Sequence, residues 1–64
     1  MPGLPNINLK IELLKRGLTQ RQLAFGIQID EPRISRIIKG YEEPTGDIKR
    51  SISEYLGIPK EKLF

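Results

Sequence analysis

The chain has 64 residues, of which 11 are Lys or Arg and 8 are Asp or Glu, so its formal net charge is +3. This length allows one domain, which buries only about 60% of the surface of its unfolded chain. The chain has no Cys and no His, which excludes disulfides and ordinary zinc sites. No apolar run approaches the ~20 residues that a membrane span needs, and the opening "MPGLPN" lacks the apolar centre of a signal peptide. We therefore expect a cytoplasmic protein with a flexible tail at residues 1–7 and one domain at 8–64.

The first predicted helix is "LKIELLKR", residues 9–16, with Asn8 as its N-cap. Its last two residues are cations, which suit the C-terminal end of the helix dipole. Gly17 is a natural stop because it tolerates the left-handed conformation that often follows a helix. The apolar pairs at helical spacing are Leu9 with Leu13 and Ile11 with Leu14.

The second predicted helix follows Thr19. Thr19 and Gln22 have the spacing of a capping box, in which each side chain satisfies the other residue's backbone N–H. Leu23 and Ile27 lie one turn apart and are expected to face inward. Ala24 is small enough to let another helix cross closely.

The third predicted helix, in "DEPRISRIIKG", has one apolar and one basic face. Asp30 is its expected N-cap, Pro32 falls in the first turn where a missing N–H costs nothing, and Gly40 ends it. At 3.6 residues per turn the three isoleucines share one face and predict a core side. Pro32, Arg36 and Lys39 point roughly the other way, and Arg33 lies on the flank.

The fourth predicted helix begins after Thr45 and ends at Gly57. Its apolar stripe is Ile48, Ile52, Tyr55 and Leu56. A last short turn in "IPKEKLF" is expected to pack Ile58 and Leu63 inward. No stretch alternates convincingly as a strand does, so the sequence predicts four helices and a short fifth. The predicted core includes Leu13, Leu23, Ile27, Ile34, Ile37, Ile52 and Leu56.

Two capped helices that start only eleven residues apart must cross steeply around a short turn at Gln28 and Ile29. That arrangement is typical of the helix-turn-helix, in which the second helix enters the major groove of DNA. Arginine suits such a helix because its planar fork can grip guanine O6 and N7 together.

The segments "GLTQRQLA", "ISRIIKG", the following "P" and "LGIP…LF", from Gly17 to Phe64, together resemble the lambda-repressor-like, or Xre-type, helix-turn-helix regulators. The resemblance implies a compact all-α fold of four to five helices with the helix-turn-helix in helices 2 and 3. It also implies sequence-specific binding of double-stranded DNA, at an inverted-repeat operator, by a weak homodimer that acts as a transcriptional regulator, most simply a repressor.

The resemblance also assigns roles by position. It implies base-edge contacts for Glu31, Pro32 and Arg36. Gln20 is expected to meet a phosphate, Arg33 a base or a phosphate, and Lys39 the DNA backbone near Gly40 and Tyr41. The full implied DNA-binding set is Gln20, Arg21, Glu31, Pro32, Arg33, Arg36 and Lys39.

Three residues depart from the usual family pattern. Gln28 stands at a turn position that is often Gly, which predicts a turn that is either shifted or strained by about 1 kcal/mol. Glu42 and Glu43 stand in a loop where basic residues are common, and they are expected to repel phosphate.

Several alternatives stay open at this stage. The basic face of the third helix is either a DNA-contacting face or merely solvated. Phe25 is expected to be buried rather than to form a partner site, and Tyr55 to be core. Ile38 either packs on its helix's last turn or is half exposed. Leu63 and Phe64 either close the core or form a dimer contact, to which Phe25 could add.

An enzyme is not indicated, because His, Cys and any glycine-rich phosphate loop are missing and no cofactor is implied. The serious alternative to DNA binding is a protein-interaction module of the same fold, such as an antitoxin that binds a toxin or another regulator.

Overall fold

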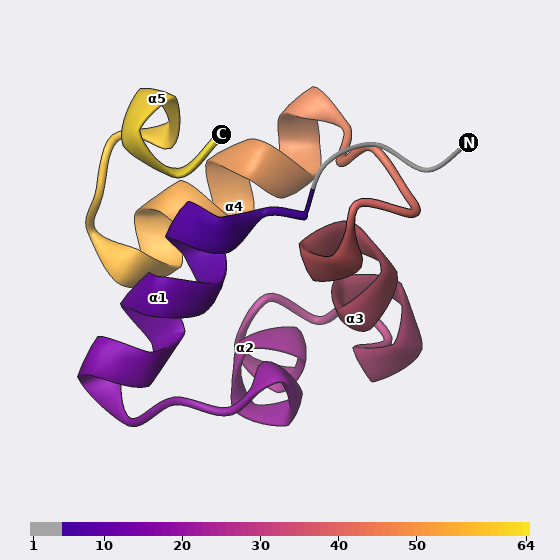
Figure 1. The fold of residues 1–64 in the computed structure, drawn as a ribbon, viewed down its shortest axis with the longest axis horizontal. Coiled ribbons are helices and arrows are strands. Elements are labelled where there is room, and N and C mark those ends of the chain that lie inside the picture. Colours follow the sequence, from indigo (N-terminus) through magenta and orange to yellow (C-terminus); the bar gives the residue numbers. More distant parts are fainter. Residues whose placement is uncertain (1–4) are drawn as a thin grey trace.

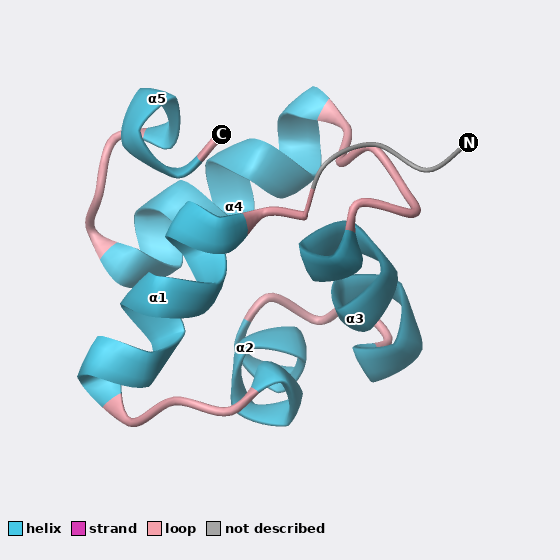
Figure 2. Cartoon of the chain, in the orientation of Figure 1, coloured by secondary structure: helices cyan, strands magenta, loops and turns pink. Residues whose placement is uncertain are grey.

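A computed structural model describes residues 5–64 and consists of helices and short connections in that part of the chain (Figures 1 and 2). The first four residues of the predicted tail lie outside the described residues. The helices are α1 (Ile7–Arg16), α2 (Gln20–Gly26), α3 (Glu31–Lys39), α4 (Gly46–Leu56) and α5 (Lys60–Leu63). The predicted all-α fold with four helices and a short fifth is therefore confirmed. None of the described helices is both long and apolar enough to cross a bilayer.

The ends of α2 and α4 are fixed by the predicted side-chain caps. The Gln22 N–H donates to the Thr19 hydroxyl oxygen at 3.0 Å, and the Thr19 N–H donates to the Gln22 side-chain carbonyl at 2.8 Å. The hydroxyl of Thr45 likewise accepts from the Ile48 N–H at 3.3 Å. Asp30 is the N-cap residue of α3, as expected, although its side chain makes no capping hydrogen bond.

The start of α1 differs from the prediction. The helix begins at Ile7 with Asn6 as its N-cap residue, so the assignment of Asn8 as the N-cap is wrong. The physical reason is a tertiary contact: the Asn6 N–H donates to the Ile38 carbonyl near the end of α3 at 2.7 Å. That hydrogen bond fixes the chain's entry into α1, and the Asn6 side chain makes no capping hydrogen bond.

One apolar core joins all five helices. Its buried residues are Leu9, Leu13, Leu23, Ala24, Ile34, Ile37, Ile38, Ile48, Ile52, Leu56 and Leu63. Six of the seven predicted core residues are among them; Ile27 is only half-buried, at the C-terminal end of α2. Ile38 and Leu63 were left open by the sequence, and both belong to the core. Of the two apolar pairs predicted for α1, Leu9 and Leu13 are buried, whereas Ile11 and Leu14 are exposed.

Two aromatic residues were predicted to be buried and are not. Phe25 is 87% exposed, because Leu23 and Ala24 occupy the inward side of α2 and a residue two positions after Leu23 points about 200° away from it. Tyr55 is 43% exposed. Its ring lies against the backbone of Gly26, where a Cβ atom would overlap it, so Tyr55 covers the rim of α2 and does not enter the core.

The α2 and α3 helices pack on each other, and α2 also contacts α4 (Figure 1). In the turn between α2 and α3, Gln28 has a left-handed φ of 59°. The Ile29 N–H in this turn donates back to the Ala24 carbonyl at 2.9 Å. The turn is therefore not shifted along the chain: Gln28 holds the position that favours Gly, while Gly26 provides the close approach of Tyr55.

Replacement of Ile34 by Ala is expected to lower the free energy of unfolding by about 2–4 kcal/mol, since Ile34 is fully buried and its removal leaves a cavity. Chemical denaturation measures the change. Ile7→Ala is the matched control, because Ile7 is 58% exposed and its loss should stay within about 0.5 kcal/mol. Equal losses for the two variants would contradict the assigned core.

The backbone conformation at Gln28 gives a second stability prediction. Gln28→Gly should raise the free energy of unfolding by up to about 1 kcal/mol, because Gly relieves the left-handed strain. Gly17→Ala is the opposite control: Gly17 has φ 66° and nothing within 4 Å of an added Cβ, so only conformational strain opposes the change. It should cost about 1 kcal/mol. A loss of stability in Gln28→Gly would contradict the left-handed strain that is assigned to Gln28.

Candidate nucleic-acid interface

The site predicted from the sequence lies on the unit formed by α2 and α3. Burial of Ile34, Ile37 and Ile38 fixes the rotation of α3 about its own axis. The residues on the opposite side of the helix are consequently exposed, and they include Pro32, Arg36 and Lys39. The predicted division of α3 into an apolar face and a basic face is therefore present in the structure.

The other predicted DNA-binding residues lie at the N-terminal ends of the same two helices. Gln20 is half-buried as the first residue of α2, and Arg21 beside it is exposed. Glu31 is exposed as the first residue of α3. Arg33 is half-buried on the flank of α3. Helix N-termini favour anions such as phosphate, which suits the position of Gln20.

Glu42 alters the electrostatics of this face in a way that the sequence did not indicate. One carboxylate oxygen of Glu42 accepts from Arg33 Nε at 2.6 Å, and the other accepts from Arg36 Nε at 3.2 Å. The hydrogen bond from Arg33, supported by that from Arg36, lowers the pKa of the Glu42 carboxyl against an opposing effect of burial. Glu42 was expected only to repel phosphate; in the structure it bridges two of the predicted DNA-binding arginines.

The backbone after α3 brings Glu42 to this position. Gly40 ends the helix in the left-handed conformation, with φ 83°. The N–H groups of Tyr41 and Glu42 then both donate to the Arg36 carbonyl, at 2.8 and 3.3 Å. The loop thus folds back over the last turn of α3. The sequence signal here is an acidic residue two positions after the helix-ending glycine, and it does not identify the partner, because the partner depends on the path of the loop.

The bridge leaves most of each guanidinium group available. A guanidinium carries five N–H donors. In each of Arg33 and Arg36, the Nε–H is the one donor that is hydrogen-bonded to an oxygen of residues 5–64. Their side chains are 42% and 52% exposed. Both arginines therefore keep their terminal NH₂ groups for an outside acceptor while Glu42 holds the inner nitrogen.

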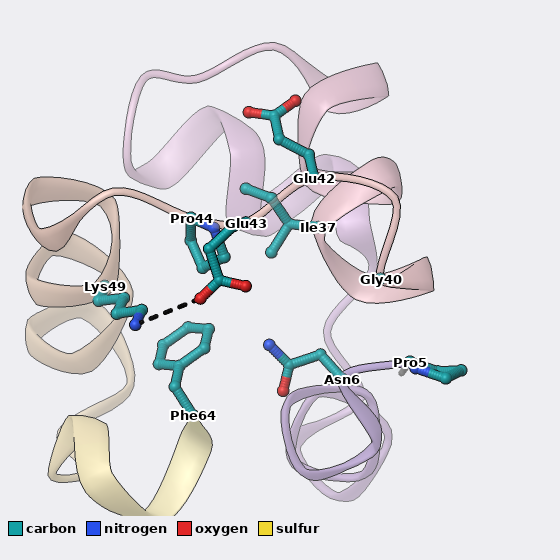
Figure 3. A pocket seen from close by; sticks show the side chains of 9 residues that line it. All are labelled: Pro5, Asn6, Ile37, Gly40, Glu42, Glu43, Pro44, Lys49 and Phe64. Atoms are coloured by element: carbon teal, nitrogen blue, oxygen red, sulfur yellow. Dashed lines mark ion pairs between the residues drawn. The ribbon is translucent and has the colours of Figure 1, made fainter. Parts of the chain in front are cut away.

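The neighbouring glutamate faces a different surface. Glu43 pairs with Lys49 of α4 at 3.6 Å, and Lys49 Nζ lies 5.8 Å from the centre of the Phe64 ring. These residues line a hollow of about 270 Å³ that also involves Asn6. Figure 3 shows Glu43 pointing into this hollow toward Lys49, whereas Glu42 points away from it. The two adjacent carboxylates thus form ion pairs on opposite sides of one loop.

The site contains nothing that indicates a metal centre: no group of three or more potential ligands gathers anywhere in residues 5–64. The α2–α3 face instead presents nitrogen donors from arginine, lysine and glutamine side chains. Such donors suit phosphate oxygens and the acceptor atoms of bases.

Comparison with known proteins agrees with this arrangement. A family profile described as "Helix-turn-helix" matches residues 9–63. No curated protein sequence matches the chain. Among solved structures, the crystal structure of the restriction-modification controller protein C.AhdI from Aeromonas hydrophila superposes with a TM-score of 0.83 at 23% sequence identity. The match covers 89% of this chain and 86% of that protein, and it supports the fold.

The family match spans all of the core-forming helices except the first two residues of α1, and it includes the whole α2–α3 unit. The pattern quoted from the sequence, the packing of α2 and α3 around a left-handed turn, and the family profile all agree. The chain belongs to the helix-turn-helix family of DNA-binding domains, of the lambda-repressor-like or Xre type.

Proposed function

We propose that this protein binds double-stranded DNA sequence-specifically through α3 and acts as a transcriptional regulator, most simply a repressor. The observation that carries the proposal is the opposition on α3 between three buried isoleucines and an exposed face bearing Arg36 and Lys39. In a helix-turn-helix, packing against the first helix orients the second helix so that its exposed face enters the major groove, and here α2 and α3 are these two helices.

Within this proposal the residues divide into two kinds of contact. Glu31, Pro32 and Arg36 meet base edges: Arg36 suits guanine, Glu31 can accept from cytosine N4, and Pro32 offers an apolar contact to a thymine methyl. Gln20, Arg21 and Lys39 hold the DNA backbone or lie near it. Arg33, beside them, contacts either a base or a phosphate.

We propose further that two copies bind an inverted repeat and dimerise weakly in free solution. Recognition helices on adjacent turns of DNA lie about 34–36 Å apart. The longest dimension of the domain is 30 Å, which is less than that spacing, so we expect only a small contact between the two copies. Leu63, which the sequence offered for a dimer contact, is buried in the core, whereas Phe64 is partly exposed and Phe25 is exposed.

A protein-interaction role is the second candidate, and the exposed aromatic residues favour it. Phe25 is 87% exposed, and it lines a shallow, mainly apolar hollow together with Tyr55. The other residues of this hollow are Leu18, Arg21, Gln22 and Gly26. The grouping of the two rings supports this role, since contiguous exposed apolar surface marks contact sites for other proteins whereas a single exposed apolar side chain does not. A toxin or another regulator is the kind of partner that an antitoxin of this fold would bind.

Substitution of Arg36 and Lys39 separates base contacts from backbone contacts. Arg36→Ala should weaken binding to a preferred duplex by about 1–3 kcal/mol while nonspecific binding changes only by the loss of one charge. Lys39→Ala should weaken all sequences alike and reduce the magnitude of the salt slope by about one unit. Titration of a preferred and a scrambled duplex at three salt concentrations measures both effects.

Each other outcome of this titration has a defined meaning. Equal weakening of both duplexes by Arg36→Ala would make Arg36 a phosphate contact and contradict its assigned role. No effect of either variant on any duplex would show that the basic face does not contact DNA, and the protein-interaction role would then be favoured.

The proposed dimeric binding predicts the size of the protected DNA. At saturating protein, footprinting should show two protected half-sites with centres about 34–36 Å apart on one face of the duplex. Analytical ultracentrifugation of the free protein should show mainly monomer at micromolar concentration, because the available contact is small. Protection of a single half-site at saturation would contradict the proposal.

A further inference from the structure

The Glu42 bridge has a consequence for how the basic face selects its ligand. A carboxylate that already occupies the Nε–H groups of Arg33 and Arg36 competes with every other anion for them. It also offsets one of the two positive charges at the place where phosphate would arrive. A phosphate that binds at this face must therefore either displace Glu42 from the two arginines or lie close to the negative charge of its carboxylate.

A base edge meets the same bridge differently. The terminal NH₂ groups of both arginines make no hydrogen bond within residues 5–64, the two side chains are 42% and 52% exposed, and the Nε hydrogen bonds restrict the orientation of the two planar forks. A guanine edge needs two donors from one fork at fixed spacing, which a restrained guanidinium supplies with less loss of side-chain freedom. The bridge is therefore compatible with a specific contact and unfavourable to a loose phosphate contact.

We infer that Glu42 is a specificity-determining positioning residue, which holds Arg33 and Arg36 for base edges and lowers the affinity of the face for DNA that offers only phosphates. This inference rests on the proposed DNA-binding function. It gives the acidic residue after α3 a definite role: Glu42 does not simply repel DNA but decides which DNA is bound.

Glu43 provides a matched control for this role. It is adjacent in the chain and carries the same charge, but it pairs with Lys49 on the other side of the loop (Figure 3). Glu42→Gln and Glu43→Gln each remove one negative charge, at adjacent positions in the chain. Only Glu42→Gln removes the acceptor shared by the two arginines.

The test uses two duplexes of equal length: one enriched from a random pool by the wild-type protein, and one with the same bases scrambled. Both variants should strengthen binding to the scrambled duplex and increase the magnitude of the salt slope by up to about one unit. Only Glu42→Gln should also narrow the ratio between the enriched and the scrambled duplex. The expected narrowing is roughly three- to ten-fold, the scale of two exposed ion pairs.

A measurement without DNA tests the bridge itself. In nitrogen-15 spectra of the free protein, the Nε–H resonances of Arg33 and Arg36 should shift and exchange faster with water in Glu42→Gln, and stay in place in Glu43→Gln. Thermal unfolding of both variants checks that each is folded. Unchanged Nε–H resonances in Glu42→Gln would overturn the inference.

The binding data separate this inference from the function on which it rests. If the wild-type protein binds no duplex at low salt, the proposed DNA-binding function and the role of Glu42 both fail. This result is obtained with the wild-type protein, before any variant is compared. If the wild type discriminates between the duplexes and the two variants change the ratio equally or not at all, the DNA-binding function stands and the role of Glu42 is overturned.

Discussion

Burial of the isoleucine face of α3 is the constraint on which the rest of the structure depends. Ile34, Ile37 and Ile38 are each at most 4% exposed, and burial of such a side chain contributes about 1.5–3 kcal/mol. Any rotation of α3 that carried its cations inward would expose these residues, which a domain of 64 residues with a single small core cannot tolerate. The direction in which Arg36 points is thus set by packing on the opposite side of the helix.

The other helices hold α3 in place at its two ends. At the N-terminal end, the turn through Gln28 lets α2 pack on α3, and Ala24 of α2 is buried in the core. At the C-terminal end, the Asn6 N–H bonds to the Ile38 carbonyl, which ties α1 to the end of α3. The loop beyond Gly40 bonds back to the Arg36 carbonyl and so carries Glu42 to the basic face. The arrangement of charges on that face is therefore a consequence of the backbone around it.

The parts of the fold that depend on sequence neighbours could be predicted, and the parts that depend on tertiary contacts could not. The capping box at Thr19 follows from local rules. The left-handed residue in the turn was indicated only by the family pattern, which left a shifted turn open, and the structure places it at Gln28. The start of α1, by contrast, is decided by a hydrogen bond to α3, and Tyr55 lies outside the core because α2 offers it the bare backbone of Gly26. In the candidate site, the division of α3 into two faces was predictable from periodicity. The contact of Glu42 with Arg33 nine residues earlier was not, since it depends on the path of the intervening loop.

A low net charge and a carboxylate at the binding face are consistent with selective DNA binding. Phosphate contacts supply essentially all nonspecific affinity, and a regulator must find its site among a very large excess of other sequences. Occupancy of the site therefore depends on the ratio of specific to nonspecific affinity, and this ratio rises equally well when nonspecific affinity falls. The formal charge is only +3, and two of the exposed arginines are bridged by Glu42, so little positive charge is left on this domain for phosphates. In the proposed role of Glu42, the ion pairs that partly neutralise the face also orient its two guanidinium groups, and this orientation would let a small recognition helix discriminate between sequences.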